Sequence, residues 1–187
     1  MKTLTLLLGF CATASALAQN FTILQANEAL RHGDTISLVA VDSGRWLAAA
    51  PGNETEGVVQ LAPLDGGERS PTRWRVEEPA QGVYSFRCLG IGDGPMWING
   101  LTRISRVITS PSPVGASGAG WGIYREGGGI TLKCLGTVAG GRWLVGDARD
   151  NTVRLVSEEA ADGATVWQVR VWSRTTEPGR PTGTQRR

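Results

Sequence analysis

The chain repeats one pattern three times, and this repetition limits its possible folds more than any other feature. A tryptophan in a β-like setting recurs at Trp74, Trp121 and Trp167, so the period is 47 and then 46 residues. Each copy also contains an alternating apolar stretch, a Gly-rich turn and an earlier tryptophan. A near-constant period of this length is typical of a repeat architecture, in which each copy forms one structural unit.

Each copy divides into four short strands. The first copy opens with Ile36, Leu38 and Ala40 alternating with Ser37 and Val39, which is the two-residue period of a half-buried strand. No convincing helical period occurs in the repeats, so the sequence predicts an all-β protein with a closed architecture. The expected strands are 36–40, 45–49, 58–62 and 72–77 in the first copy, 83–89, 96–99, 104–109 and 120–125 in the second, and 130–135, 142–145, 152–156 and 166–172 in the third.

This pattern resembles a β-trefoil, in which three four-stranded units surround a pseudo-threefold axis and each fourth strand carries an aromatic residue. Equivalent inward residues of a closed barrel pack as layers, and tryptophans that recur with the repeat are expected in the core. The expected layers are Ile36, Tyr84 and Ile130, then Leu38, Phe86 and Leu132, then Ala40, Cys88 and Cys134, with Trp46, Trp97 and Trp143 packed beneath the second strands.

The chain begins with the pattern of a secretory signal peptide. Lys2 supplies a positive charge, residues 4–10 are apolar, and residues 16–18 read Ala-Leu-Ala, which fits a cleavage site. No later run is long and apolar enough to span a membrane, so we expect a secreted, extracellular protein. The expected segments are a signal peptide at 1–18, a lead-in at 19–33, the β-trefoil domain at 34–172 and a disordered basic tail at 173–187.

Secretion changes how the cysteines are interpreted. Cys88 and Cys134 occupy equivalent steps of two copies and share one expected layer. In an oxidising compartment they are expected to form a disulfide. The alternative is two buried thiols, because symmetry mates in a barrel can lie beyond the ~7 Å limit between the Cα atoms of a disulfide. Asn20 and Asn53 lie in sequons that are compatible with N-glycosylation.

The polar residues supply no catalytic arrangement. His32 is the only histidine, and it lies in a turn without a second histidine to form a metal site. Cys88 and Cys134 lie in mid-strand, which is a poor position for a nucleophile. A near-neutral charge without a dense basic block disfavours nucleic acid as a partner. We therefore expect a monomeric binding protein that uses exposed loops and needs no metal or cofactor, and not an enzyme.

The strand phrases around Trp74, Tyr84 and Trp167 resemble those of secreted fungal trefoil protease inhibitors of the mycocypin-like type. This resemblance implies a papain-like or serine protease as the partner, and a role as a secreted effector against host proteases. By the same analogy, the protease-binding loops are the first and third turns of the first copy, namely Asp42, Ser43 and Gly44, and Asp65, Gly66, Gly67 and Glu68.

Two other kinds of trefoil protein share part of the pattern. Ricin-type lectins carry a glutamine two residues before the closing tryptophan, whereas the three copies here have Thr72, Ala119 and Thr165 at that position. Fascin-like trefoils share the phrase at 43–47, but a signal peptide disfavours an actin partner. A lectin-like module that binds glycans is the alternative function.

Overall fold

The chain is all-β in the computed structural model, which describes residues 21–52, 56–64, 67–90, 96–111, 119–136, 142–163 and 165–175. A short strand β1 (Thr22–Ile23) precedes three copies of four strands, and two short 3-10 helices, η1 (Thr102–Ile104) and η2 (Glu158–Gly163), lie in the second and third copies. The strands of the copies are β2 (Thr35–Ala40), β3 (Trp46–Ala50), β4 (Gly57–Ala62) and β5 (Trp74–Ala80), then β6 (Val83–Cys88), β7 (Met96–Leu101), β8 (Arg106–Ser110) and β9 (Trp121–Glu126), then β10 (Gly129–Cys134), β11 (Trp143–Asp147), β12 (Thr152–Val156) and β13 (Trp167–Ser173).

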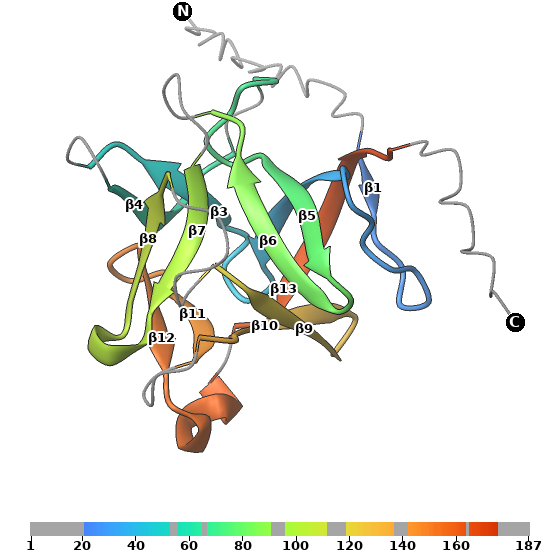
Figure 1. Cartoon of the computed structure of the whole chain (residues 1–187). Helices are drawn as coiled ribbons and strands as arrows, with labels where there is room; N and C mark the ends of the chain where they lie inside the picture. Colours follow the sequence, from blue (N-terminus) through green and yellow to red (C-terminus); the bar gives the residue numbers. More distant parts are fainter. Residues whose placement is uncertain are drawn as a thin grey trace, which may run out of the picture.

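The first and fourth strands of the three copies close into a barrel (Figure 1). Antiparallel pairing runs in order through β2, β5, β6, β9, β10 and β13, and β13 pairs again with β2. The second and third strands form the hairpins β3–β4, β7–β8 and β11–β12. Because β4, β8 and β12 also pair with one another, the three hairpins meet on one side of the barrel. This arrangement is the predicted β-trefoil, which is therefore confirmed.

The barrel interior contains the layers that the repeat alignment predicted. Of the nine aligned positions, eight are buried, and the ninth, Tyr84, packs against the core while it stays partly exposed. A tyrosine hydroxyl keeps water or a polar partner within reach, which favours this intermediate position. Trp46 and Trp97 are buried as expected, but Trp143 is only half-buried. The three copies therefore differ at their second strands.

The closing tryptophans fill the centre of the core. Trp74, Trp121 and Trp167 have no exposed surface. Nε1 of Trp74 donates a hydrogen bond to the carbonyl oxygen of Leu47 at 3.0 Å, and Nε1 of Trp121 donates to that of Ile98 at 3.2 Å. Each bond joins the fourth strand of a copy to its second strand. Nε1 of Trp167 is buried without a hydrogen-bond acceptor among the described residues, so the third copy has no equivalent hydrogen bond there between its fourth and second strands.

The predicted disulfide between Cys88 and Cys134 is not formed, and the alternative of two buried thiols is the one observed. Sγ of Cys88 donates to the carbonyl oxygen of Pro71 at 3.8 Å, and Sγ of Cys134 donates to that of Gly100 at 3.9 Å. β9 lies between β6 and β10 and pairs with both. Trp121 on β9 pairs with Cys134 and with Tyr84, which lies four residues before Cys88 on β6. The two cysteine Cα atoms are therefore separated by more than two strand spacings, about 10 Å, which exceeds the ~7 Å limit for a disulfide. Burial also raises the pKa of Cys134, which keeps it a thiol.

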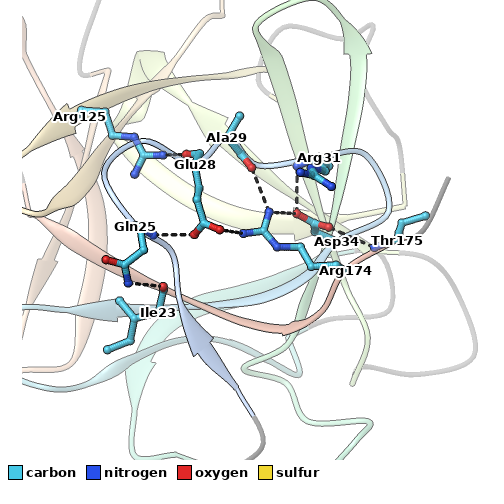
Figure 2. A network of polar contacts seen from close by, with 9 residues as sticks. All are labelled: Ile23, Gln25, Glu28, Ala29, Arg31, Asp34, Arg125, Arg174 and Thr175. Atoms are coloured by element: carbon cyan, nitrogen blue, oxygen red, sulfur yellow. Dashed lines mark hydrogen bonds and ion pairs between the residues drawn. The ribbon is translucent and has the colours of Figure 1, made fainter. Parts of the chain in front are cut away.

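A polar network fixes the lead-in segment to the end of β13 (Figure 2). The guanidinium of Arg174 donates to the carboxylate of Asp34 at 3.2 Å and to the carbonyl oxygen of Ala29 at 3.1 Å, and it pairs with Glu28 at 3.3 Å. The Asp34 side chain is fully buried and also accepts a bond from the backbone nitrogen of Arg31 at 3.0 Å. The network therefore satisfies a buried charge while it joins the two ends of the described chain.

The folded part of the chain continues past residue 172. Ser173 pairs with Thr35, and the backbone nitrogen of Thr175 donates to Asp34 at 3.3 Å. Gly33 has a φ of +85°, and a Cβ atom there would collide with the Thr175 side chain, so glycine allows this close approach. The predicted signal peptide at 1–18 and the tail from 176 onward lie outside the described residues.

Replacing Arg174 by alanine is expected to lower the free energy of unfolding by about 1–3 kcal/mol, because the buried Asp34 carboxylate loses a charged hydrogen-bond donor. Urea unfolding followed by far-UV circular dichroism measures this loss. Glu28→Gln is the matched control, because the Glu28 side chain is exposed and its pairing contributes at most about 1 kcal/mol. Equal effects of the two substitutions would show that the network is an ordinary surface contact.

Candidate functional site

The threefold arrangement creates three equivalent positions on the outer wall of the barrel. Each position is formed by three neighbouring strands, which are the fourth strand of one copy and the first and second strands of the following copy. Each of these strands contributes one outward side chain. The register aligns the first-strand residue directly with the tryptophan of the second strand. The three sets are Arg170, Val39 and Trp46, then Glu77, Arg87 and Trp97, and then Tyr124, Lys133 and Trp143.

The first position is covered by other parts of the chain. Trp46 is only 5% exposed. Its ring lies 6.4 Å from the ring of Phe21 in the lead-in and 6.4 Å from that of Trp172 in β13. The guanidinium of Arg170 lies 4.8 Å from the Trp46 ring centroid, and that of Arg73 lies 3.9 Å from the Trp172 ring centroid. This stack covers the Trp46 ring, while Phe21 and Trp172 stay partly exposed.

The second position is closed by charged side chains. Trp97 is 7% exposed, and its Nε1 donates to a carboxylate oxygen of Glu77 at 2.9 Å. Glu77 also pairs with Arg87 at 3.6 Å. The polar groups at this position therefore bind one another and cover the ring between them.

At the third position, the described residues leave aromatic rings partly exposed. The rings of Tyr124 and Trp143 lie 5.2 Å apart and are inclined by 57°, and Tyr124 is 46% exposed. Nζ of Lys133 lies 5.1 Å from the Trp143 ring centroid and donates to Glu158 at 2.6 Å. The other carboxylate oxygen of Glu158 accepts a bond from Nε1 of Trp143 at 3.3 Å. We call these four residues the Tyr124–Trp143 platform.

Local sequence explains why this position stays open. A Cβ atom at Gly122 would lie 3.1 Å from the Tyr124 ring and 3.3 Å from Leu135, so the missing side chain lets the tyrosine ring lie over the strand. η2 follows β12 almost directly and brings Glu158 to the edge of Trp143. Leu135 is partly exposed and extends the apolar surface beside the tyrosine.

The electrostatics of the platform are balanced. The hydrogen bond from the Lys133 ammonium is the main reason that the pKa of the Glu158 carboxyl lies below its usual range. The Glu158 carboxyl is therefore charged at neutral pH, and the platform has one donor group and one acceptor group beside two aromatic faces. The hydroxyl of Tyr124 makes no hydrogen bond with another described residue, so it is available to a ligand. This arrangement has the chemistry that suits an amphipathic molecule with an apolar face and polar edges.

The loops predicted to bind a protease lie at one end of a hairpin. Asp42 and Gly44 are exposed, and Gly44 has the positive φ of a tight turn. Because Trp46 pairs with Ala62, this turn and the loop after β4 leave the β3–β4 hairpin at the same end. Of the second loop, Gly67 and Glu68 are exposed, while Asp65 and Gly66 lie outside the described residues, as do Asn20 and Asn53 of the sequons.

The other sequence candidate is the single histidine, which lies on the surface. His32 is exposed, and its Nδ1 accepts a hydrogen bond from the backbone nitrogen of Glu78 at 3.3 Å. Within the part of the chain that the structure describes, no group of three His, Cys, Asp or Glu residues is placed to hold a metal ion. No helix among those residues is both long and apolar enough to cross a bilayer.

Sequence reasoning did not identify the platform. Trp143 was expected to pack like Trp46 and Trp97. Tyr124 was not predicted as a site residue, because the residues at the equivalent position of the other two copies differ from it in chemistry. The available signal was the equivalent position itself, which holds glutamate in the first copy, tyrosine in the second and arginine in the third. Only the second copy has an aromatic residue at this position, Tyr124, and it follows a glycine, Gly122, by two residues.

Comparisons with known proteins address the fold. No family model and no curated protein matches the chain. The structure of Cry35Ab1 superposes with a TM-score of 0.65 at 14% identity, over 81% of this chain and 39% of that chain. The designed threefold-symmetric protein ThreeFoil gives a TM-score of 0.56 at 19% identity, over 72% of this chain and 96% of its own. These likenesses show a β-trefoil fold.

A third likeness comes from an enzyme. The GlcNAcα1-4Gal-releasing endo-β-galactosidase of Clostridium perfringens gives a TM-score of 0.56 at 11% identity. The match covers 74% of this chain but only 32% of the enzyme chain. At this identity the likeness extends to the fold and no further.

Proposed function

We propose that this protein is a secreted, non-enzymatic carbohydrate-binding protein whose binding site is the Tyr124–Trp143 platform. One observation carries the proposal: of three equivalent tryptophan positions on the barrel wall, two are covered by the chain and the third presents accessible aromatic rings. A half-exposed aromatic pair costs solvation free energy unless a partner covers it. The exposed aromatic rings of Tyr124 and Trp143 therefore favour a ligand at this position.

The chemistry of the platform suits a sugar. The C–H face of a pyranose ring is apolar and packs on an aromatic ring, while its hydroxyls need donors and acceptors at the edge. Lys133 supplies donors and Glu158 supplies acceptors, and their mutual bond fixes both at the edge of the Trp143 ring. The occurrence of this fold within a galactosidase chain fits this proposal, which depends on the platform and not on that likeness.

Binding to an array of immobilised oligosaccharides, with the mature chain as probe, tests the proposal. We expect saturable binding to a subset of the sugars, abolished by an excess of the same free sugar. Titration followed by tryptophan fluorescence should give the same affinity, because Trp143 lies in the site. Absence of binding to every oligosaccharide in both assays would contradict the proposed function.

Protease inhibition is the second candidate, favoured by one feature of the β2–β3 turn. Val41 is 56% exposed and directly precedes the exposed Asp42, so an apolar side chain projects from a turn that is closed by a hydrogen bond from the backbone nitrogen of Gly44 to the carbonyl oxygen of Ala40. If this candidate is right, the chain inhibits papain or trypsin, and Val41→Asp weakens inhibition about tenfold or more. Trp143→Ala leaves inhibition unchanged. Full residual activity of both proteases at micromolar protein would count against it.

A further inference from the structure

We infer that the ligand of the platform is an acidic saccharide, because the outward face that carries Trp143 continues into two exposed arginines, Arg106 and Arg154, that form no ion pair with a described residue. This inference rests on the proposed function and narrows its ligand class. It assigns Arg106 and Arg154 to binding a sulfate or carboxylate group of the sugar, beside the ring that stacks on Trp143.

The strand register places these residues on one surface. Trp143 pairs with Val156 on β12, and Val145, two residues further on β11, pairs with Arg154. Arg154 in turn pairs with Arg106 on β8. Trp143, Val145, Arg154 and Arg106 are all at least partly exposed, whereas the alternate residues of β11 and β12 are buried. The aromatic ring and the arginines therefore share the outer face of three neighbouring strands.

The separation matches a short oligosaccharide. Two residues along a strand correspond to about 7 Å and one strand spacing to about 4.8 Å. The Cα atom of Arg154 therefore lies about 8 Å from that of Trp143, and the Cα atom of Arg106 about 12 Å. The side chains are long enough to reach an anionic group on the sugar that stacks on the platform, or on the next sugar along the chain.

The arginine pair itself is unfavourable without an anion. Residues that face each other in antiparallel strands have Cβ atoms about 5 Å apart, and like charges at this distance destabilise the sheet. Neither Arg106 nor Arg154 forms an ion pair with a described residue. Two guanidinium groups this close bind a shared sulfate or carboxylate through parallel hydrogen bonds, which removes the repulsion.

The acidic residues nearby are engaged elsewhere. Asp150 accepts bonds from the backbone nitrogen and the hydroxyl of Thr152 at 3.0 and 2.7 Å. These bonds, and to a smaller extent the charge of Arg154, lower the pKa of Asp150. Asp147 pairs with the exposed Arg149 at 3.7 Å, and Glu158 pairs with Lys133. Asp147 and Glu158 thus have cationic partners of their own, and Asp150 is held by Thr152, so that its charge acts on Arg154 without an ion pair. Both arginines are exposed.

The test compares sulfated, uronate-containing and neutral oligosaccharides of equal length, titrated against the mature chain by calorimetry. We expect the acidic ligands to bind about tenfold or more tightly than the neutral ones, and the better of the sulfated and uronate ligands identifies the anionic group. In the double variant Arg106→Gln with Arg154→Gln, the affinity for acidic ligands should fall to that for neutral ones. Arg69→Gln, which removes an exposed charge from the loop before β5, is the matched control and should change nothing.

Each other outcome has one meaning. If acidic and neutral sugars bind equally, and the double variant binds them as the parent chain does, the inference is overturned but the proposed function stands. If no sugar binds, both are overturned. Acidic binding that survives Trp143→Ala, or that extends equally to anionic vesicles or DNA, indicates general attraction to a basic surface and also overturns it. The double variant should unfold at the same temperature as the parent chain or higher, because a like-charge pair is removed.

Discussion

Replacing Trp143 by alanine is expected to reduce oligosaccharide affinity about thirtyfold or more, because aromatic residues at the centre of a binding site contribute most of its energy. The loss has two parts. The sugar loses the ring on which it stacks, and Glu158 loses the indole donor that helps to hold it beside Lys133. Titration with the best oligosaccharide from the array measures the effect.

One conservative variant separates these parts, and a second tests the neighbouring tyrosine. Trp143→Phe keeps an aromatic face but removes Nε1, so it should lose much less affinity than Trp143→Ala. Tyr124→Phe keeps the second ring and tests whether its free hydroxyl contacts the sugar. Unchanged far-UV circular dichroism is expected for all three variants, because both positions are partly exposed. Full affinity in Trp143→Ala would place the sugar site elsewhere on the barrel.

Replacing Trp74 or Trp121 by alanine is expected to lower the free energy of unfolding by about 3–5 kcal/mol, because each substitution empties a large volume at the centre of the core. A loss of this size is a large fraction of the stability of an ordinary domain. Urea unfolding followed by circular dichroism measures it. Trp143→Ala is the matched control, because the same substitution at a half-exposed ring removes far less buried surface.

Replacing each closing tryptophan by phenylalanine tests whether the three copies differ in the hydrogen bond made by the indole nitrogen. Trp74→Phe and Trp121→Phe each lose a buried hydrogen bond, to Leu47 and Ile98 respectively. Trp167→Phe instead removes a buried donor that has no acceptor, so it should cost about 1 kcal/mol less than either. Three equal losses would mean that Nε1 of Trp167 is satisfied in solution, for example by a buried water.

The strands could be predicted because their signals are local. Alternating apolar residues and Gly-rich turns identified all twelve strands of the repeats, with small differences at their ends. One such difference is β8, which begins at Arg106 because Ser105 has a positive φ that ends η1. The short helices η1 and η2 were not predicted, because a few residues are too short to establish a helical period.

The roles of the predicted loops remain predictions. The turn at 42–44 is where the sequence placed it, and it is exposed, but exposure alone does not identify a protease as its partner. The disulfide was the clearest wrong prediction. Equivalence in the repeat put Cys88 and Cys134 in one layer, but equivalence under a threefold axis also keeps them apart, since β9 separates their strands.

The sequence by itself determined the threefold architecture and its buried tryptophans, because periodicity and apolar alternation are encoded within each copy. Only the tertiary structure decided which copy leaves its second-strand tryptophan partly exposed. Trp46, Trp97 and Trp143 are equivalent in sequence, and they differ in what distant segments place over them, such as Phe21 on the first and Glu77 on the second. Coverage of a side chain depends on contacts between residues far apart in the chain, and these contacts exist only once the barrel has closed.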